Sequence, residues 1–206
     1  MARVFVAARI PRTLAAGVAT VQRELDRRLV DVKWVEPENL HLTLRFFGEL
    51  NEGKIERVVG AVIEVTSLAT PFTARLEGIG TFPTRGRPRV IWAGMTVGSE
   101  RLSATAEALE RAFVTAGLGQ ADRPFTPHLT LGRVKDPRAR SHGGRKGERP
   151  PRQATAEMQA VVGKTHFGPA DFEVREIAVV ESRLSPRGPS YLDLHVAPLM
   201  GDGPKN

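Results

Sequence analysis

Two copies of one tetrapeptide, His-Leu-Thr-Leu, are the residues of this chain best suited to chemistry. They span His41 to Leu44 and His128 to Leu131, nearly half the chain apart. An imidazole titrates near neutral pH, so a neutral and a protonated histidine can divide the roles of general base and general acid. A hydroxyl two residues further on can donate a hydrogen bond to a non-bridging oxygen of a phosphate ester. The repeat therefore predicts phosphodiester cleavage that needs no metal ion.

Each tetrapeptide lies in a segment with the alternation of a β-strand. Side chains of a strand point to opposite faces in turn, so His41 and Thr43 share one face while the two leucines share the other. His128 and Thr130 repeat this arrangement. Two such strands side by side would place two imidazoles and two hydroxyls around one cleft, with the leucines in the core.

The histidines could also have a structural or a metal-binding role. A single copy of the motif would indicate a histidine on the solvent side of an amphipathic strand, but two copies with matching flanks make coincidence a poor explanation. A metal site would want further His or carboxylate ligands at strand or helical spacing, and neither motif contains Asp or Glu. We therefore expect no metal and no cofactor.

The composition narrows the possible classes of protein. The chain has 206 residues, which suits one compact domain over residues 1–206. It has no cysteine, which excludes disulfides, a thiolate nucleophile and zinc sites that need sulfur. Arg9, Pro11 and Arg12 interrupt the first apolar run, and no stretch approaches the roughly 20 apolar residues of a membrane span. We expect a cytoplasmic monomer that does not enter a membrane.

The elements expected to carry the motifs follow one another in a repeating order. The expected strands cover residues 3–10, 32–35, 40–47, 72–82, 89–97, 127–134, 172–181 and 191–196. The expected helices cover residues 11–29, a segment that Asn51 caps and whose apolar face runs over 55–63, and residues 102–113, closed by Gly117. The strands over 72–82 and 89–97 are expected to form a hairpin.

A basic segment from Lys135 to Arg152 differs from the rest. It has seven Lys and Arg residues against Asp136 and Glu148, while the whole chain has a formal net charge of +7. It also contains several Gly and Pro residues and lacks apolar periodicity, which predicts an inserted surface loop. The loop could steer RNA towards the cleft, or it could be a solvated insertion without a function; the sequence leaves both alternatives open.

Beyond the tetrapeptides, the chain resembles the two-histidine phosphoesterases, specifically the RNA 2′,3′-cyclic phosphodiesterases historically called 2′-5′ RNA ligases. The similarity runs nearly end to end. It includes residues 3–7, residues 34–49 around the first motif, residues 125–133 around the second, and Glu181-Ser182 followed by Gly188 and Tyr191.

The resemblance implies a bilobal α+β fold, in which two pseudo-symmetric lobes, each an antiparallel sheet backed by helices, face each other across the cleft. It implies hydrolysis of an RNA-terminal 2′,3′-cyclic phosphate, on tRNA fragments among others, to a 2′-phosphate. In this scheme His41 is the proton donor to the leaving O3′ and His128 is the proton acceptor from water. Thr43, Thr130 and Arg133 fall on phosphate-binding positions. 2′-5′ RNA ligation, 2′,5′-oligonucleotide phosphodiesterase activity, and RNA or nucleotide binding without catalysis remain alternatives.

Strict alternation does not agree with every one of these assignments. It turns Arg133 away from the cleft unless the strand twists or bulges after Gly132. It places Arg45 on the His41 face, where a salt bridge and solvent exposure are equally expected. Phe47 could stack on a base, but a core position is the commoner fate of an aromatic residue at a strand end. Tyr191 is expected to pack between the lobes rather than to line the cleft.

Overall fold

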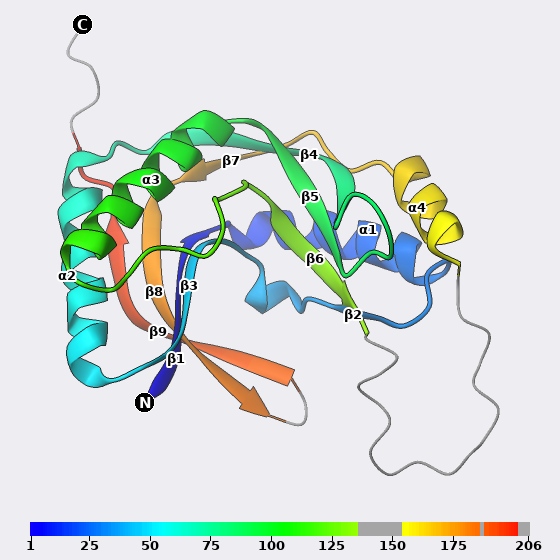
Figure 1. Cartoon of the computed structure of the whole chain (residues 1–206). Helices are drawn as coiled ribbons and strands as arrows, with labels where there is room; N and C mark the ends of the chain where they lie inside the picture. The colour runs from blue at the N-terminus through cyan, green and yellow to red at the C-terminus, as the bar shows by residue number, and fades with distance from the viewer. Residues whose placement is uncertain (136–153, 186–187, 202–206) are drawn as a thin grey trace, which may run out of the picture.

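Two antiparallel β-sheets dominate the computed structural model, which describes residues 1–135, 154–185 and 188–201 (Figure 1). The first sheet has the strand order β3-β1-β8-β9, and the second has the order β2-β6-β5-β4-β7. The first sheet comprises β1 (Ala2–Arg9), β3 (His41–Leu50), β8 (Glu176–Ser185) and β9 (Gly188–Pro198). The second comprises β2 (Val32–Trp34), β4 (Phe72–Phe82), β5 (Val90–Val97), β6 (Leu129–Val134) and β7 (Ala170–Val174). This confirms the expected α+β class with two antiparallel sheets.

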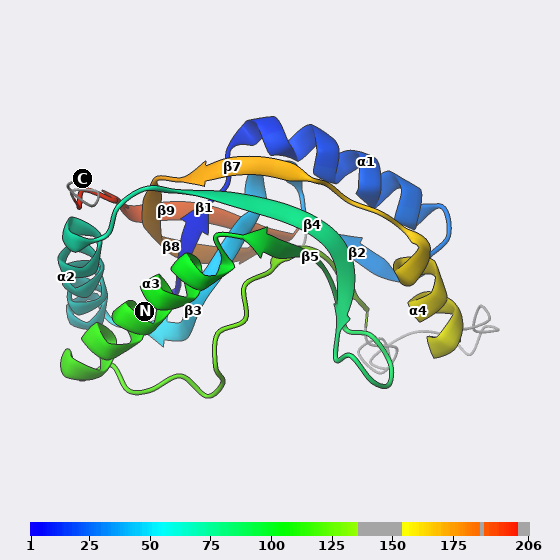
Figure 2. The ribbon, with the colours of Figure 1, turned by 90° about the horizontal axis from the view of Figure 1, so that it is seen from above.

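Helices cover the outer sides of both sheets (Figure 2). They are α1 (Ala15–Asp26), α2 (Glu52–Leu68), α3 (Ser99–Thr115) and α4 (Thr155–Lys164), with single 3-10 turns at Arg12–Leu14 and Pro37–Asn39. Helix α2 packs on β8 and β9 of the first sheet, whereas α1 contacts β6 and α4 contacts β4 of the second. Helix α3 lies beside α2 and contacts β3 and β5, so it joins the two halves.

The leucines of both tetrapeptides lie in the hydrophobic core, as alternation predicts. Leu42, Leu129 and Leu131 are inaccessible to solvent, and Leu44 is nearly so. All four belong to one cluster of buried side chains that extends over both sheets. Burial of these side chains fixes which face of β3 and β6 is left for polar groups, because a slip of one residue would expose every leucine.

Several local signals in the sequence are confirmed. Asn51 precedes α2, and its side chain accepts a hydrogen bond from the Lys54 backbone N–H at 3.0 Å. Gly117 follows α3 with φ +70°, the left-handed conformation that ends many helices. Strands β4 and β5 pair as the expected antiparallel hairpin.

Two predictions about elements were wrong. The single strand expected over 172–181 divides at Arg175 into β7, which pairs with β4, and β8, which pairs with β1 in the other sheet. The reason is a change of pattern: β7 alternates, whereas the central strand β8 is buried continuously over 177–180. Helix α4 was not predicted, because Met158 and Val162 are its only buried residues and mark too narrow an apolar stripe.

Candidate active site

Strands β3 and β6 belong to different sheets but contact each other, and this contact brings the two motifs together. His41 and Thr43 lie in β3, while His128 directly precedes β6 and Thr130 lies within it. All four side chains are partly accessible to solvent, in contrast to the buried leucines between them. Alternation therefore predicted the facing of these four side chains correctly.

The two imidazoles make the same hydrogen bond to the backbone. His41 Nδ1 lies 2.7 Å from the carbonyl oxygen of Asn39, and His128 Nδ1 lies 2.7 Å from that of Thr126. A carbonyl oxygen can only accept, so Nδ1 carries the hydrogen in both rings. Each neutral ring is thereby fixed in one tautomer, with the Nε2 lone pair available for a proton transfer.

Burial lowers the pKa of both histidines below the ordinary value. For His41, desolvation is the largest cause; the Asn39 carbonyl opposes it, and the charges of Arg133 and His128 add to the lowering. For His128, desolvation again comes first, the Thr126 carbonyl opposes it, and Arg133 lowers the pKa further. The charge of Arg133 thus lowers the pKa of both histidines.

A β-bulge follows the threonine in each motif. In the pairing of β1 with β3, Ala7 lies opposite Thr43 and Val6 opposite Arg45, so Leu44 is the extra residue. In the pairing of β5 with β6, Trp92 lies opposite Thr130 and Ile91 opposite Gly132, so Leu131 is the extra residue. An extra residue reverses the alternation beyond it. The two bulges occupy the same place in the two tetrapeptides.

The bulge in β6 places Arg133 on the cleft side. Because the alternation reverses at Leu131, Arg133 shares a face with Thr130 and lines the same pocket. The condition attached to the Arg133 prediction, a bulge in its strand, is thus met, although the bulge lies just before Gly132 rather than after it. Arg133 is an exposed residue, so its guanidinium is accessible to a ligand.

The bulge in β3 corrects the expectation for Arg45. Arg45 turns away from the His41 face and forms an ion pair with Glu110 of α3, with 2.6 Å between Nη1 and Oε2. Of the two outcomes left open for Arg45, the salt bridge is observed, but on the opposite side of the strand. Strict alternation failed here because it cannot anticipate a bulge.

The same bulge at Leu44 also exchanges the expected faces of two neighbouring phenylalanines. Phe47 packs edge-on against Phe113 of α3, with 5.0 Å between ring centroids. It therefore has a core position, the commoner of the two outcomes expected for it. Phe46 instead lies opposite Phe5, lines the pocket and is 49% exposed. Sequence reasoning missed Phe46; its only signal was that one of two adjacent aromatic residues must face the cleft.

Gln22 of α1 holds the bulge in β6. Its Nε2 donates to the carbonyl oxygens of Leu131 at 2.9 Å and Val35 at 2.8 Å, and Gln22 is only 7% exposed. The backbone N–H of Val35 also donates to the Leu131 oxygen, at 2.9 Å. The carbonyl of the extra residue thus has two partners, and the bulge is tied both to the segment after β2 and to α1.

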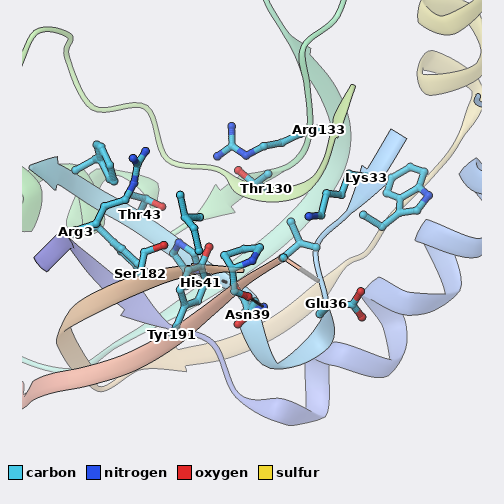
Figure 3. Close-up of a pocket in the computed structure, with 17 residues that line it drawn as sticks. Arg3, Lys33, Glu36, Asn39, His41, Thr43, Thr130, Arg133, Ser182 and Tyr191 are labelled. Carbon is cyan, nitrogen blue, oxygen red and sulfur yellow. Dashed lines mark hydrogen bonds between the residues drawn. The ribbon is translucent and has the colours of Figure 1, made fainter. Parts of the chain in front are cut away.

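A pocket with a volume of about 520 Å³ lies beside these groups. Its lining includes His41, Thr43, Thr130 and Arg133, together with Arg3 and Ser182 from β1 and β8. Figure 3 shows His41 and Thr43 of the first sheet and Thr130 and Arg133 of the second around this space. The pocket is on the His41 side of the site, since His128 does not belong to its lining.

Aromatic rings fix the orientation of both imidazoles. The Phe5 ring stacks on His41 with centroids 4.7 Å apart, and Tyr191 meets the same imidazole edge-on at 5.3 Å. Phe82 meets His128 edge-on at 5.1 Å. The prediction that Tyr191 packs between the lobes rather than lining the cleft was wrong: its ring partners Phe5 and His41 belong to its own sheet, and Tyr191 lines the pocket. Burial raises the pKa of its phenol, and Arg133 lowers it in part.

The described part of the chain has no group of three or more His, Cys, Asp or Glu side chains placed to hold a metal ion. Within the same residues, no helix is long and apolar enough to cross a membrane. The basic loop expected over 135–152 lies, apart from Lys135, outside the described residues.

Comparison with known proteins gives one consistent result. A family model described as "LigT like Phosphoesterase" matches residues 9–92 and 96–191. The RNA 2′,3′-cyclic phosphodiesterase of Archaeoglobus fulgidus is 36% identical over 194 residues, which are 94% of this chain and 98% of that protein. The protein of the same name from Methanothermobacter thermautotrophicus is 34% identical, over 94% of this chain and 97% of its own length.

Solved structures agree with the sequence comparison. The chain is similar to TT0787 of Thermus thermophilus, with a TM-score of 0.76 and 30% identity over 98% of this chain and 100% of that one. It also shares its fold with the Escherichia coli LigT complexed with 3′-AMP, at a TM-score of 0.68 and 22% identity over 96% of this chain and 98% of that one.

Proposed function

The chain belongs to the LigT-like phosphoesterase family, and on that premise we propose that it hydrolyses the 2′,3′-cyclic phosphate at the end of RNA to a 2′-phosphate. One observation carries the proposal. The two imidazoles come from strands β3 and β6, which contact each other, or from directly before them, and each has Nδ1 fixed to a carbonyl oxygen and Nε2 left for proton transfer. The relatives named for this activity align with nearly the whole chain, which supports the same reaction here.

In the reaction, a water oxygen attacks phosphorus while the bond from phosphorus to O3′ breaks. His128 Nε2 takes the proton of the water, and protonated His41 Nε2 gives its proton to O3′. The product keeps the phosphate on O2′. The two histidines then exchange one proton with solvent, so no group other than water is consumed.

The place of the pocket supports this division of roles. In an in-line displacement the attacking water and the leaving oxygen lie on opposite sides of phosphorus, so the ribose that carries O3′ lies next to the acid. The pocket adjoins His41 and has room for a nucleoside. The hydrogen bond of His128 is exposed to solvent while that of His41 is partly buried, which gives the base the freer access to water.

The phosphate would be held by Thr43, Thr130 and Arg133. The two hydroxyls can donate to the non-bridging oxygens, and the guanidinium adds charge-assisted hydrogen bonds to oxygens whose charge grows in the transition state. These three residues line the pocket from β3 and β6, next to His41. Because they lie on strands rather than on loops, the groups are oriented before the substrate binds.

The test is turnover of an RNA that ends in a 2′,3′-cyclic phosphate, in EDTA, with the product identified by phosphorus NMR. Each of H41A and H128A is expected to reduce kcat by about 10²–10⁴-fold, the usual contribution of a general acid or base. H166A is the matched control, because His166 is exposed and outside the pocket. Full activity of H128A, or a 3′-phosphate or a ligated RNA as the sole product, would overturn the proposal.

A further inference from the structure

The pocket extends beyond the reacting groups to a second positive side chain. Besides the groups around His41, its lining includes Lys33 and Trp34 of β2 and Gly188 of β9. We propose that Lys33 forms a second phosphate subsite, which binds the phosphodiester on the 5′ side of the terminal nucleotide. This inference rests on the proposed function and concerns which substrates the site prefers.

The register of β2 and β6 places two positive charges directly opposite each other. Lys33 pairs with Arg133, so their side chains leave adjacent strands on the same face. Like charges at opposite positions of a sheet are unfavourable. Within the described residues, neither side chain has an ion pair with a carboxylate that would offset the repulsion. A bound anion near both groups would remove it.

The amino group of Lys33 reaches across the pocket to the other sheet. A Cβ atom placed on Gly188 of β9 would lie 3.2 Å from Lys33 Nζ, so the ammonium lies close to the backbone there. Figure 3 shows the amino group of Lys33 and the guanidinium of Arg133 both directed into the pocket. Lys33 therefore borders the space in which a nucleoside next to His41 would lie.

The strand that carries Lys33 is firmly held. The indole N–H of Trp34 donates to Asp26 of α1 at 2.7 Å, and the indole ring lies so close over Gly132 that a Cβ there would be 2.7 Å from it. A lysine on a fixed strand costs less to order around a ligand than one on a loose loop, since only its side chain must be immobilised.

The charges of the lining match two phosphate groups. The pocket contains three cations, Arg3, Lys33 and Arg133, and one carboxylate, Glu36. Burial keeps the histidines mainly neutral at pH 7 by lowering their pKa. The resulting excess of two positive charges equals the charge of a cyclic phosphate and one neighbouring phosphodiester. A free nucleoside 2′,3′-cyclic phosphate would neutralise only half of it.

The experiment compares substrates with one and with two phosphates. Adenosine 2′,3′-cyclic phosphate has only the reacting group; its 5′-phosphorylated form and the dinucleotide ending in a cyclic phosphate each add a second. In K33A the ratio of kcat/KM for either two-phosphate substrate to that for adenosine 2′,3′-cyclic phosphate is expected to fall about tenfold, the value of one partly exposed charge-assisted hydrogen bond. K33R should restore most of this ratio, and K54A, which removes an exposed lysine of α2, should keep the wild-type ratio.

Salt dependence gives a readout that a structural role of Lys33 would not change. For a long single-stranded RNA that ends in a cyclic phosphate, the slope of log kcat/KM against log salt concentration should become less steep by about 0.7 in K33A, as expected for one lost phosphate contact. A wild-type ratio and slope in K33A would overturn the subsite, and so would an equal change in K54A.

A binding measurement separates this inference from the proposed function. By isothermal titration, wild-type protein is expected to bind adenosine 2′,5′-bisphosphate more tightly than adenosine 2′-monophosphate, and K33A is expected to lose most of the difference. Equal affinities for the two ligands in the wild type would overturn the subsite even if RNA is hydrolysed. A difference that K33A abolishes would support the subsite even if no turnover is found.

Discussion

Replacement of Gln22 by methionine tests whether the bulge in β6 depends on a residue of α1. The change removes the hydrogen bonds from Nε2 to the carbonyl oxygens of Val35 and Leu131 while keeping a side chain of similar volume. The Leu131 oxygen still accepts from the Val35 N–H. The Val35 carbonyl oxygen loses its hydrogen bond to Gln22, in a place where the Gln22 side chain is almost completely buried.

The expected loss of stability follows from these contacts. Each neutral hydrogen bond contributes roughly 1 kcal/mol net, so the free energy of unfolding should fall by about 2 kcal/mol. For a domain of this size, 1 kcal/mol shifts Tm by about 2–4 °C, so Tm should fall by roughly 4–8 °C. Differential scanning calorimetry measures this. The loosened bulge should also reduce kcat/KM for an RNA cyclic phosphate, because Arg133 follows the bulge on the cleft side.

Q159M is the matched control. Gln159 also donates to a backbone carbonyl, that of Gly86 at 3.2 Å, but this bond is exposed. Its loss should change stability by no more than about 0.5 kcal/mol, as is usual for surface substitutions. If Q22M and Q159M had the same Tm, the buried amide would not stabilise the bulge. If Q22M lost stability but kept its full kcat/KM, the orientation of Arg133 would not depend on Gln22.

Three further predictions concern the site and its strands. The pH profile of kcat/KM should be bell-shaped with its centre below 6.5, because burial lowers the pKa of both His41 and His128 from that value in the free protein; the kcat profile should lie at higher pH, since the bound phosphate anion raises both. T130V should reduce kcat about tenfold with little change in KM, as measured by steady-state kinetics, because its hydrogen bond strengthens in the transition state. F47A should lower Tm more than F46A in thermal unfolding, because Phe47 packs on a core ring whereas Phe46 is half exposed.

The central polar groups could be predicted because their pattern is local. Alternation over three residues is enough to place His41 and Thr43 on one face and the leucines in the core, and the second motif repeats it. The tautomer of each ring could not be predicted in this way. It depends on a carbonyl two residues earlier, at Asn39 and Thr126, whose direction is set by the backbone just before each strand.

Side chains beyond the threonines could not be placed from periodicity, since their direction depends on contacts distant in the sequence. The bulge at Leu131 is stabilised by Gln22, which is 109 residues away. It is also next to Gly132, where the Trp34 ring leaves no room for a side chain. Residues 128–134 alone do not indicate either contact. The failure of strict alternation at Arg45 and Arg133 therefore marks the places where tertiary packing determines the site.

The equivalent bulges also place different side chains beside the two histidines. Each turns the residue three positions after the threonine into the cleft, and that residue is Phe46 in the first sheet and Arg133 in the second. A cation therefore comes from the strand of His128, while an aromatic side chain comes from the strand of His41. For the proposed substrate, the anionic phosphate would lie near Arg133, and the base would lie near Phe46. Two histidines with identical backbone hydrogen bonds thus have unequal neighbours, as the proposed division of acid and base roles between them requires.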